Sequence, residues 1–395
     1  MIGDLHIHSR FSRACSNAIT FENLVKWARI KGLHLLGTGD FTHPIWFKEI
    51  KENLVEKNGL YYYNDFPFVI TGEISLIYTQ ERGRKVHLVI LVPSVEVAEK
   101  IHSYLDAKGR RDYDGRPIFK ISCEQFVEDM MDISKDIEVI PAHIWTPYFG
   151  VFGSMSGFDS LEEAFGSQKE NIHAIETGIS SDPDMNLKIK ELRNKSIVSF
   201  SDAHSFWPYR LGREATIFKK TDSYLGILEQ IRNNSFIATI ETDPAYGKYH
   251  YDGHRICNFS SSPEKTKQLN GICPVCGKTL TLGVDYRVEK LSNGKETESK
   301  KYYTLLPLHE LISLTFENGM QSKRVWNTYN ALIDFFGNEF EILLNVPREK
   351  FIEKNINAKL IGLILKNRSG NIKVKPGYDG IYGKALFTET QATLS

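Results

Sequence analysis

The stretch Asp4-Leu5-His6-Ile7-His8 ends the first apolar run of the chain, residues 2–8, which we predict to be a β-strand. Imidazole and carboxylate are the side chains that borderline divalent metals such as zinc and manganese prefer. Other short apolar runs end in the same side-chain types, at Asp40, Glu73, His87, His143, Glu176, Asp202 and His204. A single His-x-His pair arises easily by chance, whereas this repetition at successive strand ends predicts a multinuclear metal centre.

The composition is that of a soluble globular protein, with 41% hydrophobic and 25% charged residues. A length of 395 residues exceeds one ordinary core, which favours two or three domains. No apolar stretch reaches the roughly 18 residues that cross a bilayer, and His6 comes too early for a signal peptide to precede the first strand. Five cysteines do not make a disulfide framework in a chain of this size. We therefore expect a reduced, cytoplasmic protein.

Strand and helix patterns alternate along residues 1 to about 225. Thr20 is placed to cap a helix that Gly32 ends, and residues 68–78 and 85–92 are predicted to form a strand pair joined by a polar turn. Such alternation favours an α/β architecture with a largely parallel sheet. In parallel barrels, active sites form where the strands end, and the candidate metal ligands lie there.

The pattern changes near Tyr246. The following residues are rich in Tyr, Gly and Ser, and helical periodicity returns from Leu305. We therefore expect a barrel at residues 1–240, a zinc-binding part at 241–303 and a helical part at 304–395. The net charge of the whole chain is zero, but from Glu241 onward basic residues outnumber acidic ones, which suits a polyanionic partner.

The order of the candidate ligands resembles that of the polymerase and histidinol phosphatase (PHP) family over about the first 215 residues. The resemblance implies a distorted (β/α)7 barrel that holds two or three divalent metals, which are zinc, magnesium or manganese. It also implies that Glu73 bridges two of these ions. Carried over by position, the metal ligands are His6, His8, Asp40, Glu73, His87, His143, Glu176, Asp202 and His204.

Two departures from the PHP pattern concern the third metal. No His or Asp follows shortly after the His-x-His pair, and Phe41 follows Asp40 where the family usually has a histidine, so we expect two tightly held metals and leave a third open. Two cations about 3.5–4 Å apart lower the pKa of a bound water and hold phosphoryl oxygens, which predicts hydrolysis of a phosphate ester. The predicted catalytic residues are Glu73, Glu176, Asp202 and His204. For Glu176 and Asp40 an alternative stays open, in which each orients a ligand histidine from outside the metal shell.

A second metal site is predicted further along the chain. Cys273-Pro274-Val275-Cys276-Gly277 is a Cys-x-x-Cys knuckle in which glycine allows a tight turn, and His254 and Cys257 supply a matching pair. Four such ligands close a tetrahedral Zn²⁺ site with no open position, which indicates a structural ion that stabilises a small domain. Asp252 or His250 is an alternative fourth ligand, and metal-free cysteines beside an unrelated histidine are a further alternative.

With this knuckle and a helical tail behind a PHP-type barrel, nearly the whole chain resembles the endonuclease Q family. The resemblance is carried by residues 37–44 (Gly-Thr-Gly-Asp-Phe-Thr-His-Pro), 249–255 (Tyr-His-Tyr-Asp-Gly-His-Arg), 271–278 (Gly-Ile-Cys-Pro-Val-Cys-Gly-Lys) and 377–380 (Gly-Tyr-Asp-Gly). It implies a metal-dependent hydrolase that nicks damaged DNA on the 5′ side of uracil, hypoxanthine, xanthine and abasic sites. The implied products are a 3′-hydroxyl and a 5′-phosphate.

The C-terminal part has the composition of a DNA-binding segment. Its basic residues follow one another with few acids between them, and those that we predict to contact DNA are Lys366, Arg368, Lys373 and Lys375. Such a stretch can follow a phosphate backbone, and a solvated basic face is the alternative.

Two aromatic loops follow predicted ligands, one at residues 144–152 after His143 and the other at 206–210 after His204. An enzyme that inspects a base extrudes it from the stack and holds it between aromatic walls, so we expect one loop to form this pocket. Packing inside the barrel is the alternative. The predicted substrate-binding residues here are Trp145, Tyr148, Phe149, Trp207, Arg210 and Arg213.

The stretch Gln391-Ala392-Thr393-Leu394 resembles the start of a sliding-clamp binding peptide, but it lacks the aromatic anchors, so chance is favoured over a clamp partner. Two other functions stay open at this point. One is a phosphomonoesterase that acts on a small metabolite, although the zinc knuckle and the basic tail would then have no task. The other is a nucleic-acid-binding protein without catalysis, against which the intact Glu73, Asp202 and His204 argue.

Overall fold

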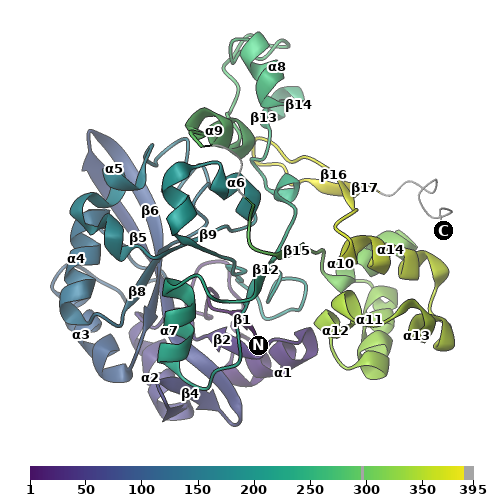
Figure 1. The fold of residues 1–395 in the computed structure, drawn as a ribbon, viewed down its shortest axis with the longest axis horizontal. Helices are drawn as coiled ribbons and strands as arrows, with labels where there is room; N and C mark the ends of the chain where they lie inside the picture. The colour runs from purple at the N-terminus through teal and green to yellow at the C-terminus, as the bar shows by residue number, and fades with distance from the viewer. Residues whose placement is uncertain (295–297, 387–395) are drawn as a thin grey trace.

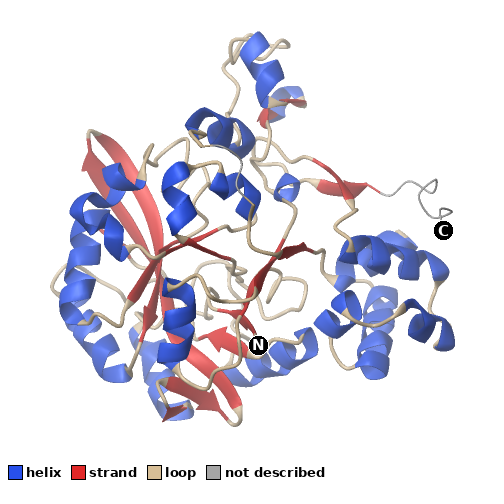
Figure 2. Cartoon of the chain, viewed as in Figure 1, coloured by secondary structure: helices blue, strands red, loops and turns tan. Residues whose placement is uncertain are grey.

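The computed structural model describes residues 1–294 and 298–386, and Figure 1 shows an α/β body that carries two further parts. Strands lie inside the body, and helices cover its outside (Figure 2). The strands are β1 (Ile2–Asp4), β2 (Leu35–Gly37), β3 (Val55–Lys57), β4 (Leu60–Tyr63), β5 (Phe66–Gln80), β6 (Arg82–Val92), β7 (Ile118–Phe119), β8 (Glu138–Pro141), β9 (Ala174–Glu176), β10 (Ser196–Val198), β11 (Ala215–Ile217), β12 (Ala238–Glu241), β13 (Asp252–His254), β14 (Phe259–Ser261), β15 (Tyr302–Thr304), β16 (Lys373–Lys375) and β17 (Lys384–Leu386).

The α-helices are α1 (Phe21–Lys31), α2 (Pro44–Asn53), α3 (Val95–Asp106), α4 (Cys123–Ile133), α5 (Leu161–Phe165), α6 (Pro183–Leu187), α7 (Tyr224–Arg232), α8 (Pro263–Gln268), α9 (Val284–Leu291), α10 (Leu308–Phe316), α11 (Lys323–Phe336), α12 (Glu339–Leu344), α13 (Arg348–Glu353) and α14 (Ala358–Arg368). The short 3₁₀ helices are η1 (Gly166–Asn171), η2 (Lys190–Asn194), η3 (Pro244–Tyr246) and η4 (Arg255–Cys257). Within the described part of the chain, no helix is both long enough and apolar enough to span a bilayer.

Helix α1 shows how the local sequence sets an element of the body. The Thr20 side chain accepts a hydrogen bond from the Asn23 backbone N–H at the start of the helix, and Gly32 takes a left-handed φ of 94° at its end. Apolar residues recur at helical spacing and are buried on one face, among them Leu24 and Ala28. The cap and the stop that the sequence predicted are both confirmed.

Strands β5 and β6 form a long antiparallel hairpin, which confirms the predicted strand pair at 68–78 and 85–92. Glu81 alone separates the two strands, and its left-handed φ of 59° makes the turn. The register pairs Glu73 with Val89 and Ser75 with His87. Glu73 and His87 therefore lie diagonally across the hairpin on one face, close enough for their side chains to meet.

The sheet of the body curves into a barrel. It runs in the order β15-β12-β11-β1-β2-β5-β4-β3, and β6 joins β5 to β8. The separate pair of β9 and β10 closes the gap: Ile7 bridges Ala203, His8 N–H donates to Ala203 O at 2.9 Å, and Ile144 N–H donates to Glu176 O at 3.1 Å. The ends of strands that are far apart in sequence thereby meet around one centre.

The sheet is mixed, where the sequence pattern favoured a largely parallel one. Strands β1, β2 and β5 are parallel neighbours, but β11, β6 and β8 each run antiparallel to the strand that they join. The reason is clear for β6, because it follows β5 directly and a parallel pair needs a long crossover connection. The predicted α/β class, with a barrel followed by a cysteine-bearing part and a helical C-terminal region, is confirmed.

Two further parts adjoin the body. Strands β13 and β14 with α8 project from it at the top of Figure 1, and α10 to α14 form a helical region at the right. A buried ion pair ties that region to the body, because Lys31 Nζ of α1 donates to Glu339 Oε1 of α12 at 2.7 Å. After α14 the chain turns back, and Tyr251 N–H donates to Gly377 O at 2.9 Å. The last described residues therefore pack against the segment that leads into the projecting part.

Candidate metal centre and substrate cleft

The first candidate metal group gathers residues from three places in the barrel: His6 and His8 after β1, Glu73 on β5, and Asp202 after β10. His8 Nε2 lies 2.9 Å from Asp202 Oδ1 and 3.3 Å from Glu73 Oε2. His6 Nε2 lies 3.6 Å from Asp202 Oδ1 and 3.5 Å from Glu73 Oε2. One ligand atom from each residue lies within 4.8 Å of all the others, so that a single ion could contact all four.

Glu73 also belongs to a second group, with His87 on β6 and His143 after β8. Its Oε1 lies 2.7 Å from His87 Nδ1 and 3.1 Å from His143 Nε2. The Thr146 hydroxyl donates to His143 O at 3.0 Å and accepts the His143 Nδ1 proton at 2.9 Å, which leaves Nε2 as the ligand nitrogen. Because the other oxygen of Glu73 faces the first group, this one carboxylate can bridge two ions.

Glu176 and Asp40 lie on the far side of the ligand histidines. Glu176 Oε1 accepts from His6 Nδ1 at 2.9 Å, and Asp40 Oδ1 accepts from His8 Nδ1 at 2.9 Å. The second oxygen of Asp40 accepts from both the backbone N–H and the hydroxyl of Ser9, each at 2.6 Å. Each carboxylate holds the Nδ1 of a histidine and so presents its Nε2 to the cage. The geometry favours the orienting alternative over direct ligation for both residues.

Three residues of the site have a left-handed backbone. The φ angle is 44° at Asp40, 30° at His143 and 48° at Asp202, and each lies shortly after a strand end. Such conformations cost about 1–3 kcal/mol each in non-glycine residues and persist only where the surrounding structure enforces them. Here they accompany the placement of the His143 and Asp202 side chains in the cage and of the Asp40 carboxylate behind His8.

The charges of the cage reinforce one another. Burial alone would lower the pKa of His6, but the surrounding carboxylates, that of Glu176 foremost, raise it well above the usual value. Burial would raise the pKa of Glu73, but His87 and Arg116 hold it well below the usual value. Burial lowers the pKa of His87 itself to about 4, so that this imidazole is neutral. Ionised carboxylates suit a cation, as does the neutral His87, whereas His6 must release its proton for an ion to bind.

The donor set fits divalent cations. His6 Nε2 is buried and makes no hydrogen bond to any described residue, although it faces the cage. A buried polar nitrogen without a partner is unfavourable, and an ion in the first group would satisfy it. Imidazole and carboxylate ligands suit zinc and manganese, and carboxylates also suit magnesium. The residues present therefore fit two ions that share Glu73.

A cavity of about 710 Å³ adjoins the cage, with His87, His143, Asp202 and His204 among the residues that line it. Its walls also carry cationic side chains, which are Arg116, Arg210, Arg213 and Lys248. Arg116 Nη1 donates to Glu73 Oε2 at 2.8 Å. Sequence reasoning missed Arg116 and Lys248, because neither follows a strand end or belongs to a motif.

The preceding Gly115 explains how Arg116 reaches the cage. A Cβ atom on Gly115 would lie 2.2 Å from Asp40 Oδ2 and 2.3 Å from Ser12 Oγ, so only glycine lets this loop approach so closely. The stretch Asp114-Gly115-Arg116 was the one feature of the sequence that could have pointed to Arg116 as part of the cavity wall.

The two predicted aromatic loops divide between the cavity and the core. Tyr148 and Phe149 line the cavity, and Tyr148 is 45% exposed. Trp145 is 1% exposed, and its indole N–H donates to a buried amide oxygen within the barrel. Trp207 packs edge-on against Trp27 of α1, with 5.0 Å between ring centroids. For Trp145, the structure therefore shows packing where a substrate contact was expected, whereas Trp207 is half-buried and its substrate contact stays a prediction.

Other side chains complete the walls of the cavity. Tyr249 and Tyr382 line it although they lie far along the chain from the barrel strands, and neither is among the predicted substrate-binding residues. Arg210 is exposed at the wall, as expected for a substrate contact. Arg213 also lines the cavity but is buried, and its Nε donates to Thr242 Oγ1 at 3.2 Å.

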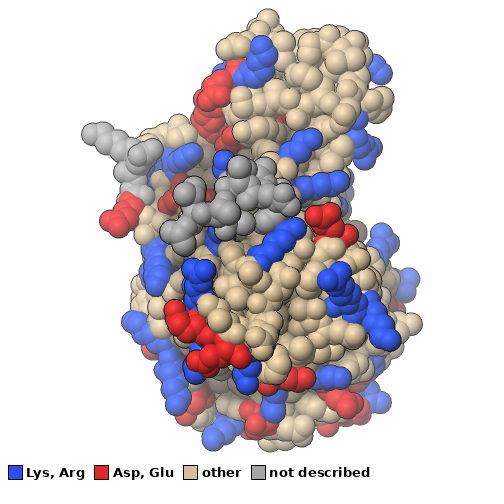
Figure 3. All heavy atoms as spheres, turned by 90° about the vertical axis from the view of Figure 1, so that its right-hand side faces the viewer, with Lys and Arg blue, Asp and Glu red and all other residues tan. Residues whose placement is uncertain are grey.

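The basic residues predicted to contact DNA separate in the structure. Arg368 donates to backbone carbonyls at the end of α12 and so stabilises the helical region, where phosphate contact was expected. Lys366 is half-buried on α14, whereas Lys373 and Lys375 are exposed on β16. Figure 3 shows basic side chains spread over this side of the molecule without a single dense patch. The clamp-like residues 391–394 lie outside the described part of the chain.

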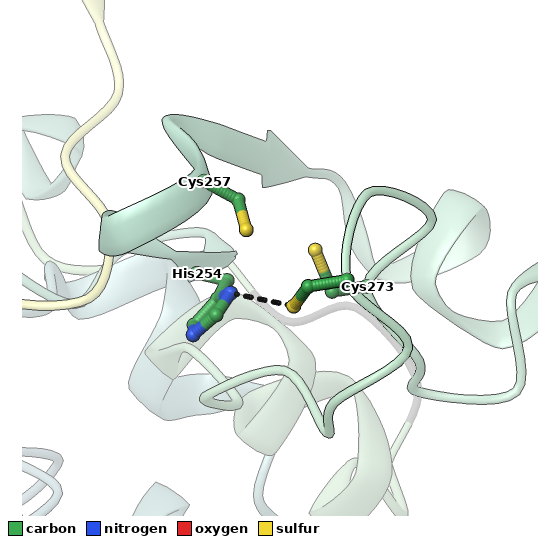
Figure 4. Close-up of side chains that lie close together, drawn as sticks. His254, Cys257 and Cys273 are labelled. Atoms are coloured by element: carbon green, nitrogen blue, oxygen red, sulfur yellow. Dashed lines mark hydrogen bonds between the residues drawn. The ribbon is translucent and has the colours of Figure 1, made fainter.

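The projecting part holds the second predicted metal group. Its four members have ligand atoms within 4.8 Å of one another and are His254, Cys257, Cys273 and Cys276. Figure 4 shows the labelled side chains turned toward a common centre, and His254 Nδ1 lies 3.3 Å from Cys276 Sγ. Asp252 and His250, the alternative ligands, are not members of this group. Three sulfurs and one imidazole nitrogen are a donor set that fits a structural zinc ion.

Comparisons with known proteins agree with this arrangement. Residues 307–371 match the family model of the MJ0043 C-terminal domain. The chain is 36% identical over 252 residues to the uncharacterized protein MJ0043 of Methanocaldococcus jannaschii, a match that covers 62% of this chain and 31% of that protein. The chain thus spans less than two thirds of this relative's length.

Solved structures match the whole chain. The crystal structure of the lesion-specific endonuclease PfuEndoQ from Pyrococcus furiosus superposes with a TM-score of 0.90 and 29% identity, over 100% of this chain and 97% of that one. An endonuclease Q in complex with a 27-mer duplex substrate that carries an abasic lesion at the active site superposes with a TM-score of 0.88 and 29% identity, over 100% and 98%.

The barrel, the bridged cage and these matches together agree with the class of metal-dependent hydrolases, to which the matched endonucleases belong. More particularly, the chain is similar along its whole length to these two endonuclease Q structures, whose fold it shares from the barrel through the cysteine cluster to the helical region.

Proposed function

We propose that this chain is a lesion-specific DNA endonuclease of DNA repair, which hydrolyses the phosphodiester 5′ to uracil, hypoxanthine, xanthine and abasic sites. The products are a 3′-hydroxyl and a 5′-phosphate. One observation carries this proposal: two metal-ligand groups that share Glu73 lie at a cavity of about 710 Å³ in a chain that matches endonuclease Q along its whole length. The duplex with an abasic lesion bound to a relative supports damaged DNA as the substrate.

The proposed cofactors are two divalent ions in the barrel, with zinc, magnesium and manganese as candidates, and one structural zinc ion. Asp202 and the two histidines after β1 would hold one barrel ion, His87 and His143 the other, and Glu73 would bridge them. Two such ions lower the pKa of a bound water and neutralise charge on the phosphoryl oxygens. A third barrel ion stays an open prediction.

The protein supplies groups for proton transfer and for the phosphate. His204 lines the cavity, and burial lowers its pKa, so that the imidazole is neutral near pH 7. Its Nδ1 bonds to the Asp202 backbone oxygen at 3.0 Å, which leaves Nε2 to accept a proton from the attacking water. Arg116 and Arg210 line the same cavity and are placed to hold the oxygens of the phosphate. Glu176 acts through His6, whose ring it orients.

The mouth of the cavity suits a base that has left the stack. Tyr148, Tyr249 and Tyr382 come from three separate chain segments and line it together with Phe149. Aromatic walls of this kind hold an extruded base by stacking, whatever its sequence neighbours. The Lys248 ammonium lies 4.7 Å from the centre of the Tyr382 ring, which adds a cation beside the phosphates that flank such a base.

The β16–β17 ribbon is proposed as the track for the DNA backbone. Its register places Lys375 directly opposite Lys384, with Lys373 on the same face of the ribbon. Like charges directly opposite on two strands destabilise a ribbon, and no carboxylate among the described residues forms an ion pair with them. A phosphate backbone would supply the missing negative charge. In this proposal, residues 1–240 cut the DNA, 241–303 carry the structural zinc, and 304–395 bind DNA.

The proposal is tested with duplexes that carry one uracil, one hypoxanthine, one abasic site or no lesion, each incubated with Mg²⁺, Mn²⁺ or Zn²⁺. We expect a single nick on the 5′ side of each lesion, and none in undamaged DNA. The His204→Ala variant should lose this activity while its DNA affinity stays unchanged. A chromogenic phosphate monoester serves as the comparison substrate. Rapid turnover of the monoester without any nicking of DNA would contradict the proposal and would indicate a metabolite phosphatase.

A further inference from the structure

The projecting part exposes two large apolar side chains at its metal knuckles. Ile256 is 84% exposed and stands between the ligands His254 and Cys257, and Val275 is 66% exposed between Cys273 and Cys276. Isoleucine and valine side chains are ordinarily buried, because water disfavours their surface. Neither position needs an apolar residue to form the metal group, since only the flanking ligands contact the ion. Two exposed apolar residues beside the same metal group therefore indicate a surface that binds a partner.

This apolar tip is held rigidly. Residues 255–257 form η4, whose first backbone N–H, that of Arg255, donates to Asp379 Oδ2 at 2.6 Å. The Tyr378 hydroxyl donates to Asn258 Oδ1 at 2.7 Å. A Cβ atom on Gly253 would lie 2.4 Å from the Tyr378 ring, so the returning C-terminal segment is packed tightly against the base of the knuckle. The orientation of the tip is thus set by the same turn, residues 377–383, that carries Tyr382 to the cavity.

The apolar tip is also a neighbour of the cavity. A Cβ atom built on Gly380 would lie 3.4 Å from Arg255 Nη1 and 3.8 Å from the Tyr249 hydroxyl. Tyr249 lines the cavity, and Arg255 precedes Ile256 in the chain. Gly380 N–H also donates to the backbone oxygen of Lys248, another residue of the cavity wall, at 2.9 Å, so Gly380 lies between the cavity wall and the residue that precedes the exposed isoleucine.

The charged residues near the apolar tip, which is formed by Ile256 and Val275, indicate which kind of partner binds there. Arg255 directly precedes Ile256, and Lys278 lies three residues after Val275; both are exposed, and within the described part of the chain neither forms an ion pair with a carboxylate, although Asp379 accepts from the Arg255 backbone N–H. DNA, the substrate proposed above, matches both elements. Phosphates pair with the cations, and apolar side chains enter between base steps.

We propose that Ile256, supported by Val275, is a wedge that enters the base stack of the DNA where the damaged nucleotide has left it. This inference rests on the proposed function and adds to it the residue that holds the duplex open. When a base turns into the cavity it leaves a gap, and an apolar side chain that fills the gap keeps the base from returning. The cations beside the wedge hold the strands on either side. The metal knuckle keeps the wedge stiff, so little ordering is needed on binding.

The test compares one lesion in two settings. Hypoxanthine is placed either in a base pair of a stable duplex or in a short unpaired bubble of otherwise identical sequence. We expect Ile256→Ser to nick the paired substrate about tenfold more slowly than the unaltered chain, since only that substrate must be opened. The bubble should be nicked at nearly the unaltered rate. Val275→Ser should show a weaker loss of the same pattern.

A matched control and a second readout keep the test clear. Ile352 of α13 is 56% exposed in another part of the molecule, so Ile352→Ser should affect neither substrate. Zinc content measures whether the knuckle has kept its ion in each variant. In an Asp202→Asn background, 2-aminopurine placed next to the lesion should brighten on binding, and Ile256→Ser should reduce that signal.

The outcomes separate the wedge from the proposed function. Equal losses on the paired and the bubble substrate would show a general DNA contact and overturn the wedge, as would no loss on either. If the unaltered chain nicks neither substrate, the proposed function fails and the wedge fails with it. Nicking of both substrates by the unaltered chain with a selective loss in Ile256→Ser is the expected result.

Discussion

Replacing Glu73 by glutamine should disable both barrel metal groups at once. Its Oε1 lies 2.7 Å from His87 Nδ1 and 3.1 Å from His143 Nε2, and its Oε2 lies 3.3 Å from His8 Nε2 and 2.8 Å from Arg116 Nη1. Glutamine loses the charge and turns one oxygen into an NH₂ donor. In either orientation that donor faces the Arg116 guanidinium or the metal-facing nitrogens of the histidines.

The size of the effect follows from the position of Glu73. Losing a residue that only orients a metal ligand typically costs about 10–100-fold in metal affinity. Glu73 is itself a member of both groups, so Glu73→Gln should weaken both barrel sites by at least about 100-fold. Metal content after dialysis at fixed free Mn²⁺ or Zn²⁺, and the rate of nicking at a hypoxanthine lesion, measure this directly.

Glu138 provides a matched control. It too is fully buried and paired with a histidine and an arginine, since its Oε1 lies 3.1 Å from His173 Nδ1 and its Oε2 lies 2.7 Å from Arg232 Nε. It stands at the start of β8, whereas the ligand His143 follows the end of that strand. Glu138→Gln should lower the melting temperature but keep both barrel ions and the nicking rate. If Glu73→Gln kept two barrel ions and nicked like its parent, the assignment of the bridged centre would be refuted.

Three further predictions concern the zinc group, the ribbon and pH. Cys273→Ser should release one zinc ion per chain while the barrel metal content stays constant in elemental analysis; retained zinc would contradict the assigned ligand set. Lys375→Ala should reduce the slope of log Kd against log salt concentration by about one, and an unchanged slope would exclude a phosphate contact there. Burial raises the pKa of Glu241 from 4.5 to about 8, so the folded state binds more protons and stability falls as pH rises through this range. Glu241→Gln should therefore raise the melting temperature more at pH 8 than at pH 5 in calorimetry, and equal shifts would argue against a protonated Glu241.

The elements that follow from local pattern were predictable. The cap at Thr20, the stop at Gly32 and the paired runs at 68–78 and 85–92 depend on residues that are neighbours in the chain. The ligand types at the strand ends were predictable for the same reason, because a strand end and a metal-ligand side chain are both visible in a few residues. The Cys-x-x-Cys knuckle at residues 273–276 is equally local.

The sequence did not show which carboxylates of the site belong to the metal groups and which of them orient a ligand histidine. Glu73 and Glu176 both follow apolar runs, yet Glu73 lies between two groups of histidines while Glu176 lies behind His6. Which position a carboxylate takes depends on strand register and on the left-handed turns that follow the strands. Trp145 and Tyr148 stand three residues apart in one loop, and only its folding places one in the core and the other at the cavity.

The amino-acid order alone thus specified an α/β chain that ends its strands in cation-binding side chains and carries a cysteine knuckle, because alternation, capping and ligand chemistry act over a few residues. The partner of each side chain came from the closed barrel and from the C-terminal segment that returns to the cavity. Contacts such as that of Arg116 with Glu73, or of Asp379 with Arg255, join residues far apart in the chain, and no spacing rule extends over such distances.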